Sequence, residues 1–123
     1  MTQWQYTFYE DACRASDELH TQAGEYYPRC AICGGLCNNY LAHHHLISRR
    51  YGKAKNDVRD IVPMCSEKCH QMAHTKRGLT AAVLTQCEVL GEGDKETGMA
   101  IFMVGYRLWL PKTGQKGIPI DNS

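Results

Sequence analysis

Histidine and cysteine are concentrated in one short stretch of this chain. Five of the six histidines lie within 32 residues, and five of the seven cysteines lie in or just before that stretch. Cysteines and histidines paired at short spacing are typical of metal sites, and an odd cysteine count argues against a framework of disulfides alone. The pattern therefore predicts a fold organised around bound metal.

Chain length and composition agree with this prediction. A chain of 123 residues supports one small domain. Because a small domain buries a smaller fraction of its surface than a large one, a bound metal often adds to its stability. The sequence has no apolar run of transmembrane length, and its start, MTQWQYTFYEDA, lacks the pattern of a signal peptide. We expect a soluble protein located in the cytoplasm, with no membrane partner.

Two pairs of cysteines predict a structural zinc site. Cys30 and Cys33 are separated by two residues, and Cys65 and Cys69, after 31 intervening residues, are separated by three. Tetrahedral Zn²⁺ is commonly bound by two such thiolate pairs, each on one turn. Cys37 forms a further usable pair with Cys33, so its part in zinc binding stays open.

Four histidines predict a second metal site. His70 and His74 are four residues apart in a segment that reads as helix, so both side chains lie on one face and can bind one ion. His44 and His45 are adjacent on a predicted strand and point to opposite sides. One of these two can complete the metal site while the other acts as a general base on water.

Hydrophobic periodicity and turn residues indicate an α+β fold with three segments. Residues 1–27 form an N-terminal helical extension, residues 28–77 the metal-binding core, and residues 78–123 a C-terminal helical extension that ends in a loose tail. Gly78 is expected to stop one helix and Thr80 to begin the next. The expected elements are helices at 7–23, 66–76, 81–90 and 99–110, strands at 38–45 and 60–64, and a long polar loop at 46–59.

The runs AHHHLISRRYG and NDVRDIVPMCSEKCHQMAH resemble the HNH endonucleases, also called ββα-metal or His-Me finger nucleases, and especially those with an additional four-cysteine zinc site. The resemblance covers roughly residues 28–77. It implies a small ββα-metal core stapled by zinc, with flanking helices. It also implies that His45 is the general base that activates water, and that His44, His70 and His74 hold a catalytic divalent ion such as Mg²⁺ or Mn²⁺.

Asp60 stands where this family usually has asparagine, at the start of the strand DIVPMC. The family asparagine pins a loop and orients the general-base histidine. Aspartate accepts the same hydrogen bonds but donates none, and a carboxylate next to His45 would raise the basicity of the imidazole. Asp60 is therefore predicted to be catalytic. The alternative is a non-catalytic zinc-binding module, derived from such a nuclease, that binds nucleic acid or protein.

Basic residues coincide with the histidine cluster. Residues 43–77 carry eight Lys and Arg against three acidic residues, whereas the two flanking segments are slightly acidic. Such an excess favours a polyanionic partner, here double-stranded DNA. A homodimer formed through residues 99–110 would allow both strands to be cut. Small nucleases of this kind resemble those of bacteriophages, so the resemblance implies a bacterial or phage-infected host cell. The residues expected to contact phosphate are Arg49, Arg50, Lys53, Lys55 and Arg59.

Overall fold

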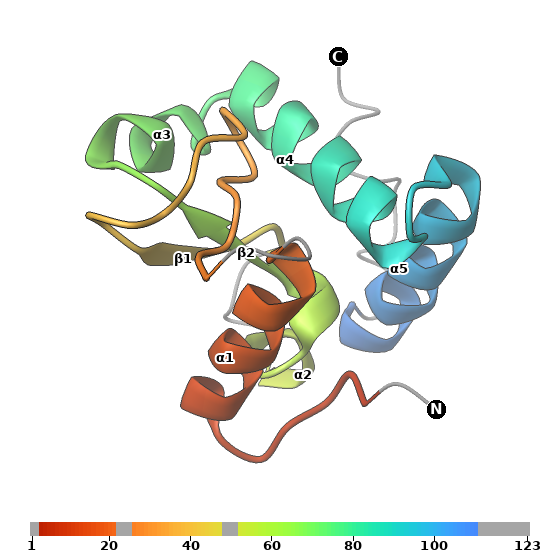
Figure 1. Cartoon of the computed structure of the whole chain (residues 1–123). Coiled ribbons are helices and arrows are strands. Elements are labelled where there is room, and N and C mark those ends of the chain that lie inside the picture. Colours follow the sequence, from red (N-terminus) through yellow and green to blue (C-terminus); the bar gives the residue numbers. More distant parts are fainter. Residues whose placement is uncertain (1–2, 22–25, 48–51, 111–123) are drawn as a thin grey trace.

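The computed structural model describes residues 3–21, 26–47 and 52–110, and it confirms a small α+β fold. Within these ranges the chain forms five α-helices, one 3₁₀ turn and a two-stranded antiparallel sheet (Figure 1). The elements are α1 (Tyr9–His20), β1 (Ala42–His45), α2 (Gly52–Lys55), η1 (Val58–Asp60), β2 (Ile61–Met64), α3 (Glu67–Met72), α4 (Lys76–Leu90) and α5 (Lys95–Trp109).

The hairpin of β1 and β2, followed by α3, forms a ββα-like unit at the centre of the molecule. The strands pair with His45 opposite Ile61 and His43 opposite Pro63. All four residues of β2 are buried, whereas those of β1 are partly exposed. Helix α1 packs on one side of the sheet, and α3 follows β2 on the other (Figure 1). The histidines of β1 therefore lie between helices and next to solvent.

A buried polar network joins α1 to α4 and β2. The hydroxyl of Ser16 donates to the carbonyl oxygen of Ile61 at 2.8 Å. The Gln86 amide nitrogen donates to the carbonyl oxygen of Arg59 at 2.8 Å, which leaves its Oε1, 2.6 Å from Nε2 of His20, as the acceptor. Burial lowers the pKa of His20 to about 4, so this imidazole is neutral at pH 7. The network fixes α1 against the central hairpin.

The boundary between α3 and α4 differs from the prediction. Ser66 caps α3, with its side chain accepting from the amide of Cys69. Helix α4, however, begins at Lys76 with Thr75 as its cap, so the expected stop at Gly78 and start at Thr80 are both wrong. A Cβ at Gly78 would lie 1.8 Å from the carbonyl oxygen of Met72. Glycine is required there because the backbone of α3 approaches α4 closely, not because a helix ends.

Helices α4 and α5 form an antiparallel hairpin that closes the core. Gly91 ends α4 and Asp94 caps α5. A Cβ at Gly98 would lie 1.5 Å from the carbonyl oxygen of Cys87, so the two helices pack backbone to backbone at this point. The residues of α5 that face the core are Gly98, Phe102, Gly105, Tyr106 and Trp109.

Residues of all three predicted segments meet in the main hydrophobic core, and Ala12 and Cys13 of α1 form a second, smaller cluster with Ile61. The buried residues of the main core include Cys30 and Val62 from the central unit and Phe102 from α5, and Trp4 and Leu19 pack against it from the N-terminal side. The segment expected to be a long polar loop contains α2 and η1 instead. The expected loose tail at 111–123 lies outside the described residues. In the part of the chain that the structure describes, no helix is long and apolar enough to cross a bilayer.

Candidate metal centres and the histidine cleft

The four predicted zinc ligands lie together. The sulfur atoms of Cys30, Cys33, Cys65 and Cys69 all lie within 4.8 Å of one another. The Sγ atoms of Cys33 and Cys65 are 3.3 Å apart, and those of Cys65 and Cys69 are 3.9 Å apart. Four thiols gathered at these distances match the tetrahedral sulfur set that Zn²⁺ prefers. The cluster is therefore compatible with a structural zinc site.

The first cysteine pair lies on a turn whose backbone amides point at sulfur. The amide of Ile32 donates to Sγ of Cys30, and the amide of Gly35 donates to Sγ of Cys33, each at 3.4 Å. Gly34 has a φ of +77°, a conformation that favours glycine. Amide donors of this kind stabilise thiolates, because they compensate the negative charge that the sulfurs carry when they bind a metal.

Cys37 does not belong to the sulfur cluster, although its spacing from Cys33 made it a candidate. Burial, together with the nearby charges of Cys30 and Asp17, raises the pKa of the Cys37 thiol to about 12. The side chain is almost completely buried within the hydrophobic core. Cys37 therefore acts as a small packing residue. The set formed by Cys30, Cys33, Cys65 and Cys69 links the beginning of the predicted metal-binding core to its end.

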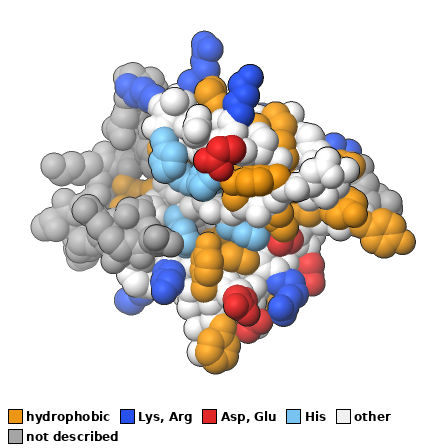
Figure 2. Space-filling model, turned by 90° about the vertical axis from the view of Figure 1, so that its left-hand side faces the viewer, with side chains coloured by type: hydrophobic (Ala, Val, Ile, Leu, Met, Phe, Trp, Pro, Cys, Tyr) orange, Lys and Arg blue, Asp and Glu red, His pale blue; other side chains and the backbone are white. Residues whose placement is uncertain are grey.

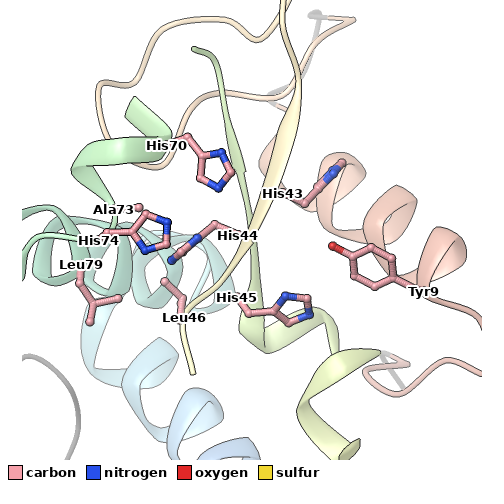
Figure 3. A pocket seen from close by; sticks show the side chains of 9 residues that line it. All are labelled: Tyr9, His43, His44, His45, Leu46, His70, Ala73, His74 and Leu79. Carbon is pink, nitrogen blue, oxygen red and sulfur yellow. The ribbon is translucent and has the colours of Figure 1, made fainter. Parts of the chain in front are cut away.

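Three histidines, from β1, from α3 and from the turn after α3, converge on one side of β1. The ring of His44 meets those of His70 and His74 edge to face, with centroids 5.7 and 4.9 Å away, and all three offer nitrogen atoms within 4.8 Å of one another. Figure 3 shows the three rings pointing toward one another. His70 lies in α3, while His74 lies in the turn just after its end at Met72. This spacing is compatible with ligation of a single ion.

His44 is held in the neutral form that a metal requires. Burial, together with the positive charge that His74 and His70 would carry, lowers its pKa to about 4. A neutral imidazole keeps a lone pair on one nitrogen, whereas an imidazolium has none to donate to a metal. His44 is therefore a neutral imidazole with an available lone pair at pH 7.

His45 points to the opposite side of β1, as strand alternation predicts. Its Nε2 lies 2.9 Å from the carbonyl oxygen of Lys55, at the end of α2. A carbonyl oxygen only accepts hydrogen bonds, so Nε2 donates to it, and in a neutral imidazole the lone pair is then on Nδ1. The ring of Tyr9 stacks on His45, with centroids 5.5 Å apart and planes inclined by 18°. Neither Tyr9 nor the Lys55 carbonyl was predicted from the sequence.

His43 shares the His45 side of the strand but is bound to α1. Its Nε2 lies 2.8 Å from Oδ1 of Asp17. Burial alone would lower the pKa of His43, but the hydrogen bonds and charges of Asp17 and Cys13 outweigh it and raise the pKa to about 9. His43 is therefore an imidazolium paired with Asp17 at pH 7, and it has no counterpart in the predicted ligand set.

Asp60 is buried beneath this site and acts on the backbone. Its Oδ1 accepts a hydrogen bond of 2.7 Å from the amide of Ile47, and its Oδ2 has no hydrogen-bond partner among the described residues. Burial raises the pKa of Asp60 well above its usual range. The sequence-based expectation was a carboxylate that orients the His45 imidazole directly. The structure instead gives that imidazole the Lys55 carbonyl, and Asp60 fixes the chain that follows His45.

The residues predicted to contact phosphate differ in their exposure to solvent. Lys53 and Lys55 lie exposed on α2, whereas Arg49 and Arg50 fall outside the described residues. The prediction for Arg59 is wrong, because its side chain is 5% exposed and donates to the buried carboxylate of Asp57 at 2.7 Å. A guanidinium in this position cannot reach a nucleic-acid backbone.

The histidines open onto one cleft. It has a volume of about 590 Å³, and both the His44 side and the His45 side of β1 contribute to its walls. Figure 2 shows histidine side chains gathered in the middle of this face, with Lys and Arg side chains above and below them. The lining residues are Tyr9, His43, His44, His45, Leu46, His70, Ala73, His74 and Leu79 (Figure 3).

Comparison with known proteins gives no independent assignment. No family model matches the chain, and no match was found among the curated proteins or the solved structures. The function must therefore be inferred from the chemistry of the two sites.

Proposed function

We propose that the cleft is the active site of a metal-dependent endonuclease of the HNH type that hydrolyses phosphodiester bonds in DNA. In this proposal His45 is the general base, and His44, His70 and His74 hold a divalent ion such as Mg²⁺ or Mn²⁺. The four cysteines hold a structural Zn²⁺.

The observation that carries the proposal is that two adjacent histidines on β1, His44 and His45, face different partners. His44 faces two further imidazoles at distances suited to a shared cation, while His45 faces away from them with its Nε2 on a carbonyl oxygen. Histidines used only for packing would not need to converge in this way beside a cleft. A separate base next to an ion site is what phosphodiester hydrolysis requires.

The chemistry assigned to His45 follows from its tautomer. With Nε2 donating to Lys55, Nδ1 takes a proton from a water molecule, and the resulting hydroxide attacks phosphorus. The bond from phosphorus to the leaving oxygen breaks, and that oxygen leaves as a hydroxyl after taking a proton from solvent. The divalent ion, when bound, stabilises the negative charge that builds up on the phosphate and the leaving oxygen.

The charge around the cleft supports a polyanionic substrate. Lys53 and Lys55 lie on α2, the element that supplies the carbonyl partner of His45, and Lys76 and Arg77 lie exposed at the start of α4, just after His74. Cations that flank the cleft from two elements would bind the phosphates on either side of the scissile bond. Such contacts provide affinity without sequence preference.

Cleavage assays with defined metals test the proposal. We expect the zinc-loaded protein to nick supercoiled plasmid when Mg²⁺ or Mn²⁺ is added, and to stop when a mild chelator removes the exchangeable ion but leaves the zinc. Linear duplex, single-stranded DNA and RNA of the same sequence would rank the substrates. A zinc-loaded, folded protein that cuts none of them with any divalent ion would contradict the proposal and favour a binding module.

A further inference from the structure

His45 is held from two directions by parts of the chain that lie far apart in the sequence. The Lys55 carbonyl oxygen accepts from Nε2 at 2.9 Å in the plane of the ring, while the Tyr9 ring covers one face at 5.5 Å. Tyr9 comes from the first turn of α1, and it lines the cleft together with His45 (Figure 3). It lies outside the ββα-like unit that contains the histidines.

The N-terminal segment also holds the backbone that carries the Lys55 carbonyl. The amide of Tyr6 donates to the carbonyl oxygen of Asn56 at 3.0 Å, and Nδ2 of Asn56 donates to the carbonyl oxygen of Thr7 at 2.9 Å. Nε2 of Gln5 donates to the carbonyl oxygen of Lys53 at 3.1 Å. The residues just before Tyr9 and those on both sides of Lys55 therefore form one hydrogen-bonded unit.

We propose that Tyr9 is a positioning residue for His45, and that the N-terminal segment is thereby part of the catalytic unit. This inference rests on the proposed function of His45 as a general base. The hydrogen bond at Nε2 fixes one edge of the imidazole, and the Tyr9 ring stacked on one face restricts rotation of the imidazole plane about χ2.

The stacking contact matters because proton transfer depends steeply on geometry. A general base must lie within hydrogen-bond reach of the water that it deprotonates, and a displacement of about 1 Å can lower a rate by about 100-fold. The stacked ring and the carbonyl oxygen together define both the plane and the tilt of the imidazole. A simple packing role for Tyr9 would affect stability but not the orientation of His45.

The test compares three substitutions in the full-length, zinc-loaded protein. Tyr9→Leu removes the aromatic face, and Tyr9→Phe keeps it while removing the hydroxyl. Phe8→Leu is the matched control, because Phe8 is the neighbouring aromatic residue and is 66% exposed. Two readouts are measured for each protein: the tautomer of His45, from nitrogen chemical shifts of ¹⁵N-histidine-labelled protein, and kcat and KM for nicking of plasmid with Mn²⁺.

We expect wild type, Tyr9→Phe and Phe8→Leu to show a single Nε2-protonated His45 and similar kcat values. Tyr9→Leu should show a mixture of tautomers and a kcat reduced by about tenfold or more, with KM almost unchanged. A Tyr9→Leu protein with the wild-type tautomer and wild-type kcat would overturn the inference. If no protein cleaves DNA, the proposed function fails, and an unchanged tautomer in Tyr9→Leu would still refute the role of Tyr9.

Discussion

Oδ1 of Asp60 accepts a 2.7 Å hydrogen bond from the backbone amide of Ile47, two residues beyond His45. The carbonyl oxygen of Asp60 accepts a second bond, of 2.9 Å, from the amide of Leu46. Asparagine at this position would offer the same Oδ1 acceptor. Aspartate can therefore fix the chain that follows His45 without donating a hydrogen bond.

The buried carboxyl group of Asp60 makes stability depend on pH. Its pKa is raised mainly by burial, so the folded chain binds a proton that the unfolded chain releases above about pH 4. Stability is therefore lost as the pH rises through the folded-state pKa. We predict that Asp60→Asn is more stable than wild type at pH 8, and that this difference shrinks toward pH 5. Urea unfolding of both proteins at the two pH values measures it, and a difference that grows toward pH 5 would contradict the assignment.

Removing the acceptor altogether should have the opposite effect. Asp60→Ala leaves the buried amide of Ile47 without a partner, which costs about 1–3 kcal/mol of stability. It also frees the chain beyond His45, so we expect nicking activity to fall while Asp60→Asn retains it. Equal activity in Asp60→Ala and wild type would show that this hydrogen bond does not position the site.

The four-cysteine cluster should determine whether the protein folds at all. Cys30→Ser is predicted to lose about one bound zinc per chain and to abolish cooperative unfolding. Cys37→Ala is the matched control, because Cys37 is equally buried but lies outside the sulfur cluster. It should keep its zinc and lose only about 1 kcal/mol. Zinc content by mass spectrometry and circular dichroism measure both effects; zinc loss in Cys37→Ala would reopen the ligand assignment.

The histidine site should bind a divalent ion independently of the zinc. His74→Ala removes one of three ligands, so we expect Mn²⁺ affinity to fall by about tenfold or more while the zinc content stays constant. Gln71→Ala, an exposed position at the end of α3, serves as the control and should bind Mn²⁺ normally. Calorimetric titration with Mn²⁺ gives the affinities. Equal affinity in all three proteins would show that His74 is not a ligand.

Arg59 and Lys53 should behave differently, although both were expected to contact phosphate. Arg59→Ala leaves the buried Asp57 carboxylate without its ion-pair partner, which is predicted to cost about 3–5 kcal/mol of stability. Lys53→Gln should leave stability unchanged and reduce the salt dependence of DNA binding by about one ion. Thermal unfolding and binding at several salt concentrations separate the two roles. A weaker salt dependence in folded Arg59→Ala would reinstate Arg59 as a DNA contact.

The parts of the site that local rules govern could be predicted from the sequence. Two cysteine pairs at short spacing belong to single turns, and strand alternation places His44 and His45 on opposite sides. The helical spacing of His70 and His74 brings them to one side, even though α3 ends before His74. Each of these inferences needs only the geometry of a few consecutive residues.

The remaining parts depend on contacts between distant segments, which no local pattern encodes. Tyr9 and the Lys55 carbonyl reach His45 only because the N-terminal segment pairs with residues 53–58, through hydrogen bonds that leave no periodicity in the sequence. Arg59 of η1 is buried because its guanidinium pairs with Asp57, the residue that caps η1, and lies against the Trp109 ring of α5. Gly78 resembles a helix stop in the sequence. Glycine is needed there for another reason, which is that the backbone of Met72 lies close to it in the folded chain.

The most direct test of the central claim is the effect of His45→Ala on plasmid nicking in the presence of Mn²⁺. The substitution should reduce kcat by roughly 100-fold to 10,000-fold, while the zinc content and the affinity for Mn²⁺ stay at the wild-type level. Because His45 faces away from the three-histidine site, loss of the base should leave the ion in place. Cleavage by His45→Ala at the wild-type rate would contradict the assignment of His45 as the general base.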